Sequence, residues 1–190
     1  MMIQNAAEHI KKVFDQHRNP EKAAAMQAYM KHMFPFFGIS SPQRIELGKN
    51  ISQIFSISFL DKNLLNSLWD EKEREYQYLA MDYLKKYKKQ LVSSDIEWVK
   101  SLIVQKSWWD TVDFLAVHLV GYLAQLQPSV IDTHINPWST DKNMWLNRTA
   151  ILFQLKYKEK TDFELLKKYI LQHLGSKEFF INKASGWALR

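Results

Sequence analysis

The sequence has no cysteine, only five glycines and five prolines, and no long apolar run. Without cysteine, the chain can form no disulfide, no thiolate nucleophile and no cysteine-ligated metal site. The scarcity of glycine and proline favours long helices with short connections over a turn-rich β-sandwich. The N-terminus lacks the apolar core of a signal peptide, and no segment reaches the length of a membrane-spanning helix. We therefore expect a cytoplasmic protein without a membrane partner.

Several enzyme motifs are also missing. The sequence contains no glycine-rich phosphate loop and no serine in a recognisable nucleophile motif. Its six histidines show no ligand spacing with acidic residues, which argues against a metal site. We expect neither a metal nor a cofactor.

Positive charge and aromatic side chains are abundant. The 190 residues include 26 lysines and arginines against 20 acids, a net charge of +6, and 14% are aromatic, with seven tryptophans. A basic balance favours a polyanionic partner, with nucleic acid as the leading candidate. Many small basic proteins bind no particular anion, so charge alone leaves both possibilities open. The length suits one domain with a substantial core, and we predict a single domain over residues 1–190.

Apolar residues recur at three- and four-residue spacing along the chain, as in amphipathic helices. No segment shows the two-residue alternation of a strand, so the sequence predicts an all-α protein. Helices are predicted over residues 3–17, from Asn19-Pro20, from Ser41-Pro42 with serine as the cap, and over residues 60–69, 73–89, 95–106, 108–127, 129–138, 142–158, 162–174 and 176–190 with Ser176 as the cap.

The helices also look like copies of one unit. Trp109 and Trp145 lie 36 residues apart, and Trp145 and Phe180 lie 35 residues apart, each near the start of a predicted helix. A period of this length that holds two helices indicates a solenoid of HEAT-like antiparallel helix pairs. A polar residue follows each aromatic by one turn, so we expect a concave basic groove lined by Asp113, Arg148 and Lys183.

The segment KSWWDTVD begins one of these helices. Ser107 and Asp110 have the spacing of a capping box, in which the serine oxygen accepts a backbone N–H and the acid reaches back. We predict that both residues cap the helix and that Trp108 packs into the repeat interior. Asp113 falls instead at the edge of the apolar stripe, on the same side as Trp109. It is either a rim acid with a lysine partner or a partly desolvated functional acid.

Arg148 lies within the apolar stripe of its predicted helix, where arginine is almost never found without a partner. Either an acid from a neighbouring repeat meets the guanidinium, or the guanidinium lines a groove and meets a phosphate. Its planar shape suits both. The next repeat offers Lys183 and Trp187, four residues apart, with Arg190 beyond them.

Five stretches of the chain resemble the bacterial AlkD-type DNA alkylation repair glycosylases, which are built from HEAT-like repeats: NPEKAAAMQAYMK, FFGISSPQR, SWWDTVD, WLNRTAILFQLKYK and SKEFFINKASGWALR. They keep their order and span almost the whole chain. The family continues beyond GWALR, so the resemblance implies a chain that is short at its C-terminus.

The resemblance implies a monomeric DNA glycosylase that excises 3-methyladenine and 7-methylguanine, both positively charged, from double-stranded DNA without base flipping. By correspondence with the family, Asp113 is the catalytic carboxylate, and Trp109 and Trp187 pack against the deoxyribose of the lesion. The expected DNA contacts are Arg148 and Tyr29 by the same correspondence, together with the basic residues Lys156, Lys183 and Arg190.

The residue types suit this chemistry. A cationic purine is a good leaving group, and a carboxylate can stabilise the positive charge that develops on the sugar. Each indole face can add about 0.5–2 kcal/mol of cation–π attraction. The alternative is a non-catalytic helical-repeat module that binds DNA or a protein, which salt-sensitive DNA binding without base release would favour.

Overall fold

The computed structural model describes residues 2–190, with side chains from Asn5 onward. Helices dominate this part of the chain, and no strand occurs within it, so the all-α prediction is confirmed. The chain divides into two compact units, Met1–Gln90 and Leu91–Arg190.

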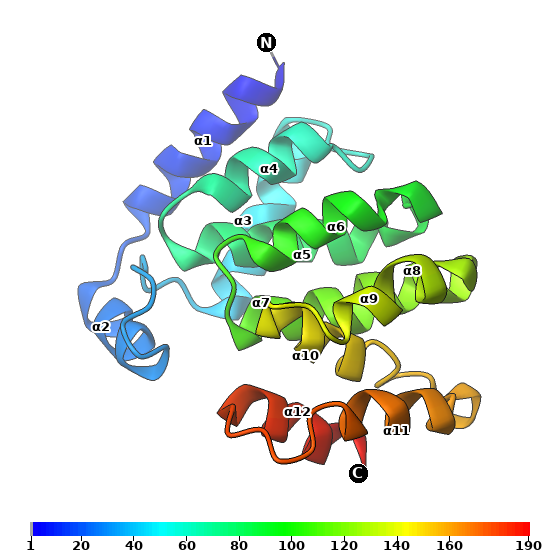
Figure 1. Ribbon diagram of the computed structural model, residues 1–190. Coiled ribbons are helices and arrows are strands. Elements are labelled where there is room, and N and C mark those ends of the chain that lie inside the picture. The colour runs from blue at the N-terminus through cyan, green and yellow to red at the C-terminus, as the bar shows by residue number, and fades with distance from the viewer. Residues whose placement is uncertain (1) are drawn as a thin grey trace. The chain divides into compact units, whose positions relative to one another are not determined.

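The described part of the first unit contains α1 (Met2–Gln16), α2 (Pro20–Tyr29), α3 (Ser41–Ile54), α4 (Lys62–Asp70) and α5 (Arg74–Tyr87), and then a 3-10 turn, Lys88–Gln90. Helices α1 and α5 each pack against both α3 and α4 (Figure 1). Between these helices lie fully buried apolar side chains, each of which contributes about 1.5–3 kcal/mol by leaving water: Ile10, Phe14, Leu65, Leu68, Trp69 and Leu79.

The second unit begins with a 3-10 turn, Ser93–Asp95, and contains α6 (Ile96–Val104), α7 (Trp109–Leu115), α8 (Gly121–Leu126), α9 (Asn136–Trp138), α10 (Met144–Leu152), a 3-10 turn, Lys158–Lys160, α11 (Phe163–Leu171) and α12 (Phe179–Ala188). Helix α10 contacts α6, α7, α9, α11 and α12 (Figure 1). Every residue of α10 after Met144 is buried. Because α10 is enclosed, its polar side chains must find partners inside the unit.

Short polar residues begin several helices, as expected for caps. Asn19 precedes α2, and its side chain accepts the backbone N–H three residues later at 3.0 Å, so this predicted start is confirmed. Two other predicted caps are wrong. Ser41 is the first residue of α3, after Ser40, and α12 begins after Glu178. Ser176 instead accepts the backbone N–H of Glu178 at 3.1 Å.

Two predicted helices differ in their course. The segment 108–127 begins at Trp109 and contains a π-helical turn, Ala116–Val120, between α7 and α8, and a similar turn, Ile131–Ile135, precedes α9. The helix predicted over 142–158 ends at Leu152. Beyond it, the side-chain amide of Gln154 bonds both the backbone N–H of Asp162, at 2.8 Å, and its carbonyl, at 3.2 Å, which folds the chain back.

A side-chain amide occupies the same place in three helices. Gln77 in α5, Asn147 in α10 and Asn182 in α12 each donate to the backbone carbonyl six residues earlier, at 2.9, 3.0 and 2.9 Å. Gln77 and Asn147 also donate to carbonyls in the last turn of the preceding helix, where the usual partner four residues ahead is lost. Their positions differ by 70 and 35 residues, so the predicted helical repeat is confirmed.

The single domain over residues 1–190 and the concave basic groove stay predictions. Among residues 2–190, no helix has both the length and the apolar character that a membrane span requires.

Candidate functional site

The junction between α6 and α7 positions the residues of the KSWWDTVD segment. Lys106 adopts a left-handed conformation, φ 50°, and reverses the chain after α6. The hydroxyl of Ser107 donates to the carbonyl of Ile103 at 2.6 Å, and Trp108, the residue before α7, forms no side-chain capping bond. The predicted role of Ser107 as a cap of α7 is therefore wrong, because its hydroxyl satisfies a free carbonyl at the end of α6.

An aromatic cluster joins the starts of three helices. The Trp108 ring lies 4.9 Å from Phe180 in an edge-to-face arrangement and 5.8 Å from Trp145, and Trp145 lies 5.0 Å from Phe180. The cluster therefore links the first turns of α7, α10 and α12, and it buries the Trp108 ring nitrogen without a hydrogen-bond partner. Aromatic pairs of this geometry each contribute about 0.5–1.5 kcal/mol beyond area burial.

Asp113 and Arg148 form an ion pair beside this cluster. Arg148 Nε and Nη2 donate to the two carboxylate oxygens at 2.7 and 2.8 Å. Arg148 Nη1 donates to the backbone carbonyl of Phe180. The Arg148 side chain is 5% exposed and that of Asp113 is 14% exposed. The sequence left two possible partners for Arg148, an acid from a neighbouring repeat or a phosphate. In the structure its partner is the acid, Asp113.

The surroundings of Asp113 shift its proton affinity. Burial raises the pKa of the carboxyl, the hydrogen bonds and charge of Arg148 lower it, and the charge of Asp110 raises it. The net result is a raised pKa. An ionised carboxylate held here is poorly solvated, and it interacts strongly with a positive charge that develops nearby.

The other residues predicted for the site lie on the same elements. Trp109 begins α7, four residues before Asp113, and is half-buried, whereas Trp187 lies on α12 and is 42% exposed. Lys183 is one turn before Trp187, and its ammonium lies 5.5 Å from the centre of the Phe179 ring. Because Arg148 bonds the first turn of α12, one side chain connects the helices of both indoles.

Lys156 and Arg190 lie at the surface of the second unit. Lys156 follows α10 and donates to His118 Nε2 at 3.2 Å, while Arg190 ends the chain after α12. Sequence reasoning did not single out His118, since histidines were considered only as metal ligands. Within residues 5–190, no three His, Asp or Glu side chains gather as metal ligands would.

Tyr29, which belongs to the first unit, is the last residue of α2 and is 70% exposed. Few of the α2 side chains are buried, so the loop after α2 holds this helix in place. Gly38 in that loop has φ 88°, and a Cβ there would lie 2.2 Å from the carbonyl oxygen of Asn19. The Asn19 N–H in turn donates to the Phe37 carbonyl at 2.8 Å.

Glu75 is buried and fixes the same loop. Its carboxylate accepts the backbone N–H groups of Phe37, Gly38 and Ile39 at 3.1, 2.8 and 3.1 Å. Burial raises the pKa of Glu75, and these hydrogen bonds lower it, with a raised pKa as the result. Together these bonds hold the loop closed onto α5.

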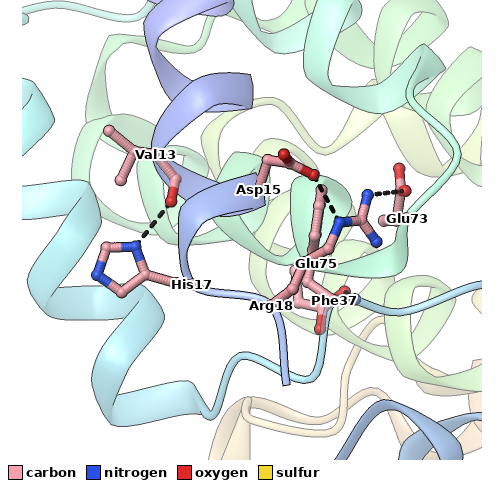
Figure 2. Close-up of polar contacts among 7 residues, drawn as sticks. All are labelled: Val13, Asp15, His17, Arg18, Phe37, Glu73 and Glu75. Carbon is pink, nitrogen blue, oxygen red and sulfur yellow. Dashed lines mark hydrogen bonds and ion pairs between the residues drawn. The ribbon is translucent and has the colours of Figure 1, made fainter. Parts of the chain in front are cut away.

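Figure 2 shows Arg18 next to this loop, between Asp15 and Glu73. Its guanidinium donates to Asp15 at 2.6 Å and to Glu73 at 3.1 Å, and it lies 4.3 Å from the centre of the Phe37 ring. The same ion pairs and ring contact join α1 to the start of α5 and to the loop after α2.

These features define a class of protein, an all-helical repeat protein in which one repeat supplies a carboxylate and the next its guanidinium partner. The chain belongs to the DNA alkylation repair enzyme family, whose model matches residues 10–190. It is similar to a solved structure described as a predicted DNA alkylation repair enzyme from Enterococcus faecalis, with 36% identity and a TM-score of 0.81 over 91% of this chain and 82% of that one. No curated protein matched the chain significantly. The AlkD-type resemblance is confirmed, and the family supports a role in the repair of alkylated DNA.

Proposed function

We propose that the protein is a DNA glycosylase that removes positively charged N3- or N7-alkylated purines from duplex DNA without flipping the base. The observation that carries this proposal is the pair of Asp113 and Arg148, in which both carboxylate oxygens are held and little exposed. A carboxylate fixed in this way needs no reorganisation to stabilise a cation that forms beside it.

The reaction follows from the charge of the lesion. Alkylation at N3 or N7 makes the purine cationic, so the bond from C1′ to the purine nitrogen breaks with its electron pair moving to the base. The base leaves as a neutral molecule, and the sugar becomes an oxocarbenium ion. Asp113 stabilises this ion and orients a water molecule, whose oxygen bonds to C1′. The released proton passes to the carboxylate and then to solvent, which leaves an abasic site and the free alkylpurine.

The remaining residues have positioning and binding roles in this proposal. The faces of Trp109 and Trp187 attract the positive sugar. Arg148 first orients Asp113. Three of its five N–H donors are used by Asp113 and Phe180, so a phosphate contact would use the other two. The expected contacts with the DNA backbone are those of Tyr29, Lys156, Lys183 and Arg190.

The test is release of 7-methylguanine from methylated duplex DNA, measured by chromatography under single-turnover conditions. Asp113→Asn removes the charge with little change of shape, and we expect its excision rate to fall by about 10² or more. Asp110→Asn in the first turn of the same helix is the matched control, and it should stay near the rate of the unchanged protein. Both variants should still bind undamaged duplex.

Two outcomes would count against the proposal. Unimpaired excision by the Asp113→Asn variant would remove the carboxylate from the mechanism. Salt-sensitive DNA binding by the unchanged protein, without base release from any methylated duplex, would favour the alternative of a non-catalytic helical-repeat module.

A further inference from the structure

A recess between α3 and α5 lies in the first unit, and none of the site residues proposed above lines it. Its inner part has a volume of about 150 Å³ and an apolar lining that includes Ile45, Gly48 and Leu79. Its outer part, of about 420 Å³, is wide open and more polar. The two parts are continuous, because both are lined by Lys49, Ser52 and Lys86.

The recess carries positive charge. Lys49 and Lys86 are exposed, and neither forms an ion pair with another of the side chains that the structure describes. The one acid in the lining, Asp82, is bound by Arg44 at 2.9 Å. Two positive charges therefore border the recess outside any of these ion pairs.

Helix capping does not account for Lys49. Lys49 lies before the last turn of α3, where the carbonyls of Ile51, Ser52 and Gln53 already accept backbone N–H groups at 3.0, 2.9 and 3.2 Å. Lys86 lies in the last turn of α5, where a cation interacts favourably with the helix end, but this interaction leaves its charge free to bind an anion. Hydroxyl groups extend the polar lining with Ser56 and Ser58, and hydroxyls are common donors to phosphate.

The helical repeat supplies an independent argument. In α5, Tyr78 follows the amide Gln77, and Lys86 lies eight residues after Tyr78. In the same way, Arg148 follows the amide Asn147, and Lys156 lies eight residues after Arg148. The two lysines are thus 70 residues apart, two periods of the repeat. Lys86 therefore has the sequence spacing of Lys156, an expected contact with the DNA backbone, although Lys86 lies within α5 and Lys156 lies after α10.

We propose that this recess binds one phosphodiester of a DNA strand, with Lys49 and Lys86 on the phosphate and the apolar inner part against the adjoining deoxyribose. The inference rests on the proposed function only in taking DNA as the partner. Excision itself requires none of the residues of the recess.

The experiment measures the affinity for an undamaged duplex as a function of salt, by fluorescence anisotropy. The Lys49→Gln/Lys86→Gln double variant should lose one phosphate contact, so the slope of log affinity against log salt should become shallower by about 0.9. Lys85→Gln/Lys89→Gln, an equal loss of two charges at exposed positions outside the recess, is the matched control and should keep the slope. Equal slopes for the two double variants would overturn the proposal.

A second arm distinguishes a strand from a free phosphate compound. Inorganic phosphate and a deoxynucleoside monophosphate are titrated separately while the protein amide signals are followed by NMR. We expect weak binding of both relative to duplex DNA. Saturation of the recess by either compound at the concentrations at which DNA binds would assign it to a small ligand and overturn the proposal.

Base release by the double variant at saturating enzyme should equal that of the unchanged protein. A protein that binds DNA with the expected slopes but releases no base would disprove the glycosylase proposal and leave this one standing. Circular dichroism of each variant checks that the fold is intact.

Discussion

At the scale of single residues, the environment of Asp113 decides what the site can do. Its carboxylate is nearly buried and is bonded at both oxygens by Arg148. Burial and the guanidinium shift the pKa in opposite directions, and burial prevails. A group with a raised pKa takes up its proton at a higher pH than an exposed aspartate, whose pKa is about 3.9.

We predict that excision falls as the pH is lowered, with a midpoint above the range of an ordinary aspartate, because only the ionised carboxylate stabilises the sugar cation. Arg148→Gln removes the bonds and charge that lower this pKa, so its midpoint should move further up. Arg148→Lys keeps the charge and should move the midpoint less. The measurement is the single-turnover rate of 7-methylguanine release against pH, with spontaneous depurination subtracted.

A midpoint at or below the ordinary range would contradict this prediction, as would an unchanged midpoint in Arg148→Gln.

The contribution of Asp113 to folding stability also depends on pH, with a sign set by its raised pKa. It is fully present below the ordinary pKa and is lost as the pH rises through the raised pKa, because the folded state binds the proton more tightly.

Sequence reasoning reached these residues but not all of their contacts. It found that Arg148 needs a partner, and the repeat already placed Asp113 and Arg148 at equivalent positions 35 residues apart. The choice between acid and phosphate depended on the distance between helices, which spacing along the chain does not give. Ser107 was assigned to the wrong helix because a serine between two helices can bond the end of the first or the start of the second.

At the scale of elements, the loop after α2 depends on residues distant in the sequence. Glu75 receives three backbone N–H groups from it, and Asn19 contacts it closely at Gly38. Two glycines in the chain, Gly38 and Gly175, have a positive φ, of 88° and 81°. They differ in what surrounds them, because a Cβ at Gly38 would meet backbone atoms and one at Gly175 would meet nothing within 4 Å.

We predict three different outcomes for glycine-to-alanine changes, measured as the free energy of unfolding in urea. Gly175→Ala should cost about 1 kcal/mol from its backbone conformation alone. Gly38→Ala should cost clearly more, since its Cβ would also lie 2.2 Å from the Asn19 oxygen. Gly186→Ala, within α12 and in open space, should stabilise by up to about 1 kcal/mol. Equal losses at Gly38 and Gly175 would show that the contact with Asn19 adds nothing.

Helix starts were easier to predict than helix ends. Starts such as Asn19-Pro20 depend on residues next to one another, and their signal is local. The end of α10 depends on the paired bonds between Gln154 and Asp162, and the π-helical turn after α7 has no sequence signal that we used. The periodicity of apolar residues predicted that each long segment is a helix. The residue at which such a helix ends depends on side chains further along the chain.

At the scale of the whole molecule, the net charge of +6 favours association with DNA. The expected backbone contacts of the second unit are basic and exposed, apart from Arg148, and each neutralised phosphate adds to the salt dependence of binding. Composition indicated this partner, and the family match supports it. Composition could not indicate which charges contact DNA, because the same residue types also cover ordinary solvated surfaces.

We predict that the affinity for an undamaged duplex falls by about 10²–10³ when salt rises from about 50 to about 200 mM, as expected for roughly five phosphate contacts. The contacts counted are those of Arg148, Lys156, Lys183 and Arg190 and the one proposed for the recess. Asp113→Asn neutralises no phosphate and should keep the same slope, which makes it the control. A slope near zero in a filter-binding or anisotropy assay would exclude a mainly electrostatic interface.

The amides Gln77, Asn147 and Asn182 have an evolutionary consequence. Each reaches a carbonyl six residues away, so the polar groups at that bend are satisfied within one helical hairpin. A duplicated gene segment of this length would therefore encode a hairpin whose backbone carbonyls at that bend need no hydrogen-bond partner from a neighbouring hairpin.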